Sequence, residues 1–64
     1  MLDINAKALD DWTALHYAVN NRNIEIAQIL LEAGADANSP TKMGTTPLHL
    51  ACLRHCIELV QLLL

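Results

Sequence analysis

The residues of this chain best suited to chemistry are its histidines and cysteines. His49, Cys52 and Cys56 follow the pattern H-x2-C-x3-C, whose spacing would place nitrogen and sulfur ligands for zinc along one face of a continuous helix. The helix that carries His49 is expected to end near Leu53 or Arg54, so Cys56 should lie in the turn that follows. We therefore interpret Cys52 as a small, buried packing residue and predict no metal site.

A second candidate is the pair formed by His16 and His49, which have nearly the same neighbours in "TALHYA" (13–18) and "TPLHLA" (46–51). Equivalent side chains on neighbouring packed helices lie about 8–10 Å apart. That separation is too large for both imidazoles to bind one zinc ion at ~2 Å. We expect a structural role instead, in which each histidine lies in the first turn of a helix and ties the preceding threonine hydroxyl to the nearby backbone.

The remaining sequence lacks the patterns that are typical of enzymes. Its two glycines, Gly34 and Gly44, do not form a phosphate-binding loop, a dinucleotide-binding loop or a nucleophile elbow. Asp10 and Asp11 are adjacent in a connector, where solvated charge is the ordinary explanation. We predict no catalytic residue, no cofactor and no enzymatic activity.

Composition narrows the choice of partner and location. The chain has 64 residues, 53% of them hydrophobic, which is typical of a folded domain, and no apolar run approaches the ~18 residues of a membrane span. The net charge is −3 and the four lysines and arginines are scattered, so we predict neither nucleic acid nor a membrane as partner. Two cysteines four residues apart do not make a secreted disulfide framework. We expect an intracellular protein, in the cytoplasm with the nucleus as the alternative.

An internal repeat is the strongest feature of the sequence. Aligning residues 1–31 with 34–64 makes 11 of 31 pairs identical, and every pair is 33 residues apart. The identical pairs are Asp3/Asp36, Asn5/Asn38, Thr13/Thr46, Leu15/Leu48, His16/His49, Ala18/Ala51, Ile24/Ile57, Glu25/Glu58, Gln28/Gln61, Leu30/Leu63 and Leu31/Leu64.

Each copy reads as two short helices and a connector. Thr46 is a good N-cap with Pro47 in the first turn, and Thr13 caps the equivalent helix. Second helices are predicted over 24–32 and 57–64, with apolar residues around most of their circumference, so each must be covered on more than one side. Gly34 follows the first of these as a left-handed stop, and residues 35–44 form a turn-rich connector.

This pattern resembles the ankyrin repeat, through "TTPLHLA" (45–51), "TALHYA" (13–18), "IEIAQILLEAGADAN" (24–38) and "IELVQLLL" (57–64). The resemblance covers essentially the whole chain. It implies a mostly α fold: an ankyrin-repeat solenoid of helix-turn-helix units joined by β-hairpin-like connectors. It also implies structural roles for the repeated motif residues, namely Thr13, Leu15, His16, Thr46, Pro47, Leu48 and His49.

The chain departs from the family pattern in its turns. Aspartate is usual at the start of the hairpin turn, where this chain has Ala8 and Thr41. A Gly-His pair is usual between the two helices, where the chain has 22–23 (Arg-Asn) and 55–56 (His-Cys). We expect these substitutions to loosen the turns, most of all in the first copy.

The phase of the repeat predicts the domain organisation. The whole of 1–64 is one ankyrin-repeat segment, in which 1–5 is the tail of a preceding repeat, 6–38 is the first repeat and 39–64 is a truncated second repeat. Such repeats bury their core against neighbours. We therefore expect either a piece of a longer array or self-association through exposed terminal repeat faces.

The predicted function is a non-catalytic protein–protein interaction module or scaffold, with a partner of unknown identity. Positions that differ between the copies should face the partner, because packing does not dictate them, and the resemblance marks the same connector tips and first-helix face. Trp12 could instead fold back across its own hairpin and shield the stem of Lys7, or pack on the preceding repeat, and Tyr17 and Leu50 favour packing. The alternative function is purely structural, as inner repeats that never touch a ligand. The candidate contacts are Lys7, Leu9, Asp10, Trp12, Asn20, Asn21, Pro40, Lys42, Met43, Thr45, Leu53 and Arg54.

Overall fold

The structure, a computed structural model that describes residues 3–64, consists of two helix pairs and their connectors. After a 3-10 turn η1 (Leu9–Asp11), the first pair is α1 (Ala14–Asn20) and α2 (Ile24–Glu32), and the second pair is α3 (Pro47–Leu53) and α4 (Ile57–Leu63). The mostly α solenoid fold is therefore confirmed, and the described residues contain no strand. The last helix ends one residue before the predicted Leu64.

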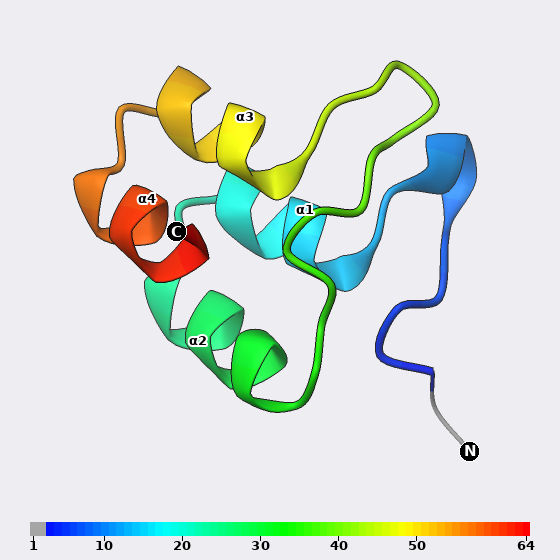
Figure 1. The fold of residues 1–64 in the computed structure, drawn as a ribbon, viewed down its shortest axis with the longest axis horizontal. Helices are drawn as coiled ribbons and strands as arrows, with labels where there is room; N and C mark the ends of the chain where they lie inside the picture. The colour runs from blue at the N-terminus through cyan, green and yellow to red at the C-terminus, as the bar shows by residue number, and fades with distance from the viewer. Residues whose placement is uncertain (1–2) are drawn as a thin grey trace.

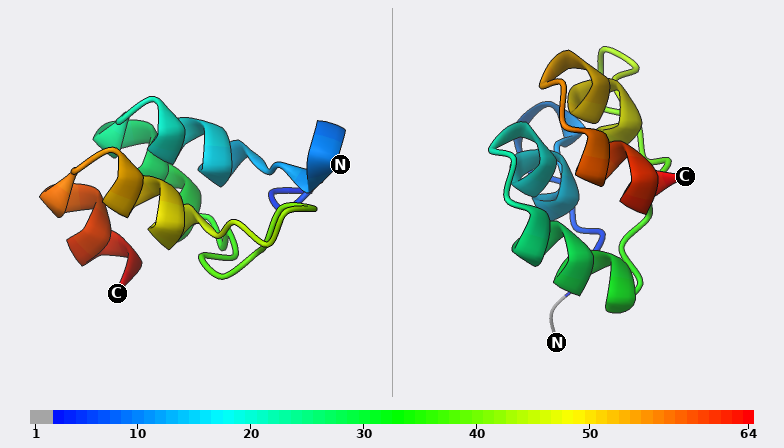
Figure 2. Two further views of the ribbon diagram at one scale, coloured as in Figure 1. Left: turned by 90° about the horizontal axis from the view of Figure 1, so that it is seen from above. Right: turned by 90° about the vertical axis from the view of Figure 1, so that its left-hand side faces the viewer.

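The two pairs stack side by side in the same orientation. Within each pair the helices run in opposite directions, while α1 packs against α3 and α2 against α4 (Figure 1). The connectors that precede α1 and α3 project together to one side of the stack (Figure 2). This arrangement puts the connector tips at one end of α1 and α3 and the inter-helix turns at the other end.

The inter-helix turns keep the same geometry in both pairs although neither contains glycine. Arg22 and His55 both adopt the left-handed conformation, with φ of 56° and 54°. The amides that follow close the turn identically, because Asn23 donates to the Ala18 carbonyl at 2.9 Å and Cys56 to the Ala51 carbonyl at 3.1 Å. A left-handed conformation costs roughly 1–2 kcal/mol for a residue with a Cβ. Each turn therefore carries local strain that the packed helices must hold.

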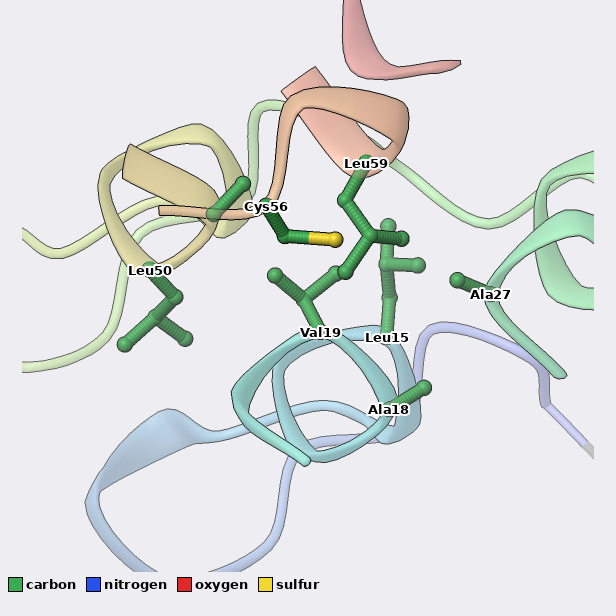
Figure 3. Packing of buried hydrophobic residues seen from close by; sticks show 8 residues of the cluster. Leu15, Ala18, Val19, Ala27, Leu50, Cys56 and Leu59 are labelled. Atoms are coloured by element: carbon green, nitrogen blue, oxygen red, sulfur yellow. The ribbon is translucent and has the colours of Figure 1, made fainter. Parts of the chain in front are cut away.

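The core lies between the two helix pairs. Leu15 and Val19 of α1 meet Leu59 of α4 and Ala27 of α2, and all four side chains are fully buried (Figure 3). Full burial of a leucine or valine side chain contributes about 1.5–3 kcal/mol. Because the cluster draws on both pairs, burial of the first pair's apolar residues depends on the second pair.

The structure corrects the prediction that Cys52 is buried. Its counterpart one period earlier, Val19, is fully buried between the pairs, whereas Cys52 is exposed. The reason is that the second helix pair covers Val19, while no element among residues 3–64 packs over the equivalent position of the second pair. Cys56 is the buried thiol, at the N-cap of α4, and it points toward Leu59 and Val19 (Figure 3).

Candidate interaction surface

Both first helices begin with the same threonine–histidine capping box. The Thr13 amide donates to His16 Nδ1 at 3.0 Å, and the Thr46 amide donates to His49 Nδ1 at the same distance. The threonine hydroxyls face the amides of His16 and His49 in return. The repeated Thr and His thus fix the start of each helix, where the first backbone amides have no intrahelical acceptor.

His16 also joins the two helix pairs. Because its Nδ1 accepts from the Thr13 amide, its ring proton lies on Nε2, which donates to the Thr45 carbonyl at 3.1 Å. The imidazole is fully buried. His49 has the same contacts to its threonine but lies exposed. The His16 ring thus connects the start of α1 to the connector that precedes α3. Within residues 3–64 no cluster of three metal-ligating side chains occurs.

The connectors form two matching hairpins. Ala8 donates to the Trp12 carbonyl at 2.7 Å, and 33 residues later Thr41 donates to the Thr45 carbonyl at 2.9 Å. Only the second hairpin has a side-chain acceptor, since Thr41 Oγ1 accepts the amides of Met43 and Thr45, each at 3.2 Å. Thr41 therefore supplies the acceptor that the family's usual aspartate would supply, and Ala8 cannot.

The hairpin tips lie next to each other and carry exposed apolar side chains. The Lys42 amide donates to the Asp10 carbonyl at 3.0 Å, which fixes one tip against the other. Leu9 is 82% exposed and Met43 is 89% exposed. Large apolar side chains that are exposed on neighbouring elements can form a patch, and such patches often mark an interaction site.

At the opposite end of the first helices, two of the predicted contact residues bind each other. Arg54 donates through Nε and a terminal nitrogen to Asn20 Oδ1, at 3.0 Å and 2.7 Å. The pairing links the end of α1 to the end of α3. A comparison of equivalent positions cannot reveal this pairing, because the two residues are 34 apart, one more than the period, and so occupy different positions of the repeat.

Trp12 lies against its own first helix. Its ring centroid is 5.5 Å from that of His16 and 5.1 Å from that of Tyr17, both tilted. The indole is half-buried and packs beside the core, while Tyr17 remains 46% exposed. Part of the Trp12 ring therefore stays accessible on the surface beside the hairpin.

The predicted contact residues differ in exposure, and so do the motif residues. Among the former, Lys7, Leu9, Asp10, Asn21, Pro40, Lys42, Met43, Leu53 and Arg54 are exposed, and Trp12, Asn20 and Thr45 are half-buried. Among the latter, Thr13, Leu15, His16 and Pro47 are buried, Thr46 and Leu48 are half-buried, and His49 is exposed.

In residues 3–64 no helix is long and apolar enough to span a bilayer.

Parallel helix pairs in a 33-residue register, capped by Thr and His and joined by projecting hairpins, define a helical repeat scaffold. The family model for ankyrin repeats in three copies matches residues 1–64. The chain belongs to the ankyrin repeat family. Ankyrin repeats generally serve as non-catalytic protein–protein interaction modules.

Curated relatives agree with this assignment. The chain is 50% identical over 58 residues to the BTB/POZ domain and ankyrin repeat-containing protein NPR5 of Oryza sativa subsp. japonica, covering 88% of this chain and 12% of that protein. It is 49% identical over 51 residues to NF-kappa-B inhibitor alpha of Sus scrofa, covering 80% of this chain and 16% of that protein. Over 64 residues it is 44% identical to the nuclear factor NF-kappa-B p105 subunit of Gallus gallus, covering 97% of this chain and 6% of that protein. The chain thus spans a small part of each of these relatives.

Proposed function

We propose that this chain binds a partner protein through its two hairpin tips and the adjoining exposed side of α1 and α3. The observation that carries the proposal is the position of Leu9 and Met43. Both side chains are almost fully exposed, and the Lys42–Asp10 hydrogen bond holds their hairpins together. Two apolar side chains on rigidly joined tips can enter a partner's pocket with little loss of backbone entropy.

The relatives support a protein as the partner. The name of the pig relative describes an inhibitor of NF-kappa-B, and the name of the chicken relative describes a subunit. Both names describe proteins that act with other proteins. The charge of −3 and the scattered cations give no basic stripe for nucleic acid.

A purely structural role is the second candidate, and one observation favours it. Asn20 and Arg54, both predicted as partner contacts, bind each other across the helix pairs. If most of the surface served the stack in this way, the chain would space other repeats without contacting a ligand. The two functions differ in what happens when the tips are changed.

The test begins with a photo-crosslinking amino acid at Met43, which captures a partner from a lysate for identification and purification. Calorimetry then compares the purified partner's affinity for the native chain, for Leu9→Asp/Met43→Asp and for Ile29→Asp. Ile29 is a matched control, because it is 58% exposed on α2, away from the tips. The proposal expects the tip variant to lose about 2 kcal/mol or more, roughly thirtyfold in affinity, and the control to bind normally. Equal affinity of all three chains contradicts the assignment of the tips, whereas a chain that captures no partner at Met43 supports the structural role.

A further inference from the structure

A groove lies between α2 and α4, on the part of the molecule away from the hairpin tips (Figure 1). Its volume is about 340 Å³, and the side chains that line it are Ile24 and Gln28 of α2 and Glu58, Gln61 and Leu62 of α4. The two helices pack against each other within the chain, so their own contact fixes the width of the groove. None of these lining residues belongs to the partner surface proposed above.

The groove combines apolar surface with polar groups. Ile24 is half-buried against the core and Leu62 is 37% exposed, whereas Gln28, Glu58 and Gln61 are exposed. A ligand in the groove therefore meets two apolar side chains, one carboxylate and two amides. An ionised carboxylate only accepts hydrogen bonds, while an amide side chain can accept or donate. The ligand must therefore bring a hydrogen-bond donor to Glu58.

The charges around the groove favour a cation. Together α2 and α4 carry Glu25, Glu32 and Glu58 and no lysine, arginine or histidine. Among residues 3–64 no cationic side chain lines the groove, and Arg54, which precedes α4, donates to Asn20 instead. Surface charges of one sign attract ligands of the opposite sign and repel those of the same sign. A positively charged donor therefore fits the groove, and a phosphate or a carboxylate does not.

We propose that this groove binds an arginine side chain of a partner protein. The guanidinium donates two parallel hydrogen bonds to the Glu58 carboxylate, a geometry that matches the planar fork of arginine. Its remaining N–H groups donate to the side-chain oxygens of Gln28 and Gln61. The aliphatic stem of the arginine lies against Ile24 and Leu62, because such stems cover apolar surface while the charged end stays polar.

Arginine suits these groups better than lysine does. A guanidinium has five N–H donors in one plane and is weakly hydrated, whereas an ammonium is a compact, strongly hydrated charge with three donors. One carboxylate and two amide oxygens at the edges of a narrow groove need the larger set of donors. The groove is separate from Leu9 and Met43, so this contact is a second binding surface that goes beyond the proposed function.

A nuclear magnetic resonance titration with the tripeptide acetyl-Ala-Arg-Ala-amide tests the proposal. The side-chain amide signals of Gln28 and Gln61 and the backbone signals of Ile24, Glu58 and Leu62 are expected to shift and to saturate. The dissociation constant should be roughly 1–10 mM, because a single side chain makes the contact.

Two further peptides separate the possible occupants of the groove. One has lysine in place of arginine, and the other has citrulline, which has nearly the shape of arginine but no charge. Both are expected to bind at least about threefold more weakly than the arginine peptide. Equal binding of the lysine peptide would indicate a site for any cation, and equal binding of the citrulline peptide would indicate a site for an uncharged group. Either result overturns the proposal.

Glu58→Gln and Glu25→Gln form a matched pair of variants. Each removes one carboxylate from the first turn of a second helix, at equivalent positions of the two copies, but only Glu58 lines the groove. Glu58→Gln is expected to weaken binding of the arginine peptide at least about threefold, and Glu25→Gln by less than about 1.5-fold. Both positions are exposed, and circular dichroism checks that each variant is folded.

Three outcomes contradict the arginine site. The first is a titration without saturable shifts, and the second is a set of shifts centred on Leu9 and Met43 instead of the groove. The third is equal weakening by both variants, since that result indicates attraction to the overall negative charge. Leu9 and Met43 are unchanged in both variants, so failure of the arginine site and failure of the proposed partner surface are distinguishable.

Discussion

The Nε2 atom of His16 lies 3.1 Å from the carbonyl oxygen of Thr45, so one buried imidazole joins the start of α1 to the hairpin that precedes α3. The other ring nitrogen caps α1 through the Thr13 amide. A histidine can do both because its neutral ring has one donor and one acceptor on opposite sides. Local helix capping and stacking of the two pairs therefore depend on the same side chain.

The first prediction compares His16→Ala with His49→Ala. The first substitution removes the cap, removes the bond to Thr45 and leaves a cavity, so it should cost about 2–4 kcal/mol. The second removes the same cap at an exposed site and should cost about 1 kcal/mol. Urea denaturation followed by circular dichroism measures both. Equal costs would show that His16 does no more than cap its own helix.

The second prediction concerns the left-handed residues between the helices. Arg22→Gly and His55→Gly should each raise stability by up to about 1 kcal/mol, because glycine adopts this conformation without Cβ strain and that gain exceeds its greater unfolded-state entropy. Asn21→Gly is the control, since φ is −92° there and the substitution should cost about 0.5–1 kcal/mol. The midpoints of thermal or urea unfolding of each variant are compared with that of the native chain. A loss of stability in Arg22→Gly would show that the left-handed conformation of Arg22 is not strained.

The third prediction uses the difference between the two hairpins. Thr41→Val keeps the side-chain shape but removes the acceptor of the Met43 and Thr45 amides, at a cost of about 1–2 kcal/mol. Ala8→Thr offers the equivalent acceptor to the first hairpin and should raise stability by a few tenths to about 1 kcal/mol. Amide hydrogen exchange at residues 43 and 45 should accelerate in Thr41→Val. Unchanged exchange at both amides means that the hydroxyl does not hold the turn.

The fourth prediction is a coupling energy between Asn20 and Arg54. A double-mutant cycle of Asn20→Ala and Arg54→Ala should give about 0.5–1 kcal/mol, because the charged donor makes two short bonds while solvent screens an exposed pair. Arg22, an exposed arginine in the other inter-helix turn, replaces Arg54 in the control cycle and should give no coupling. A cycle without coupling for Asn20 and Arg54 would return both residues to the set available for a partner.

Most of the architecture could be predicted from the sequence, because the repeat carries it. Thr13 and Thr46, placed 33 residues apart before apolar helical stripes, were sufficient to locate the helix starts. The identical Ile24 and Ile57 fixed the starts of the second helices in the same way. Helix capping and hydrophobic periodicity are local properties of a sequence, and both signals occur in each of the two copies.

What the sequence could not predict depends on contacts between the pairs. Equivalent residues such as Val19 and Cys52 were expected to share an environment, yet one lies inside the stack and the other outside. The Asn20–Arg54 bond is likewise invisible to a comparison of equivalent positions. The partner-contact residues stay predictions, since a partner leaves no mark on the geometry of the free chain. The intracellular location also stays a prediction.

Side-chain nitrogen NMR of the histidines tests most directly whether the two helix pairs stack in parallel through His16. We predict a slowly exchanging Nε2–H signal for His16, with nuclear Overhauser contacts from its ring to Thr45 and Thr46. His49 of the monomer should show a rapidly exchanging ring proton. A His16 signal that exchanges as fast as that of His49, with no contact to Thr45 or Thr46, would contradict the stacked arrangement.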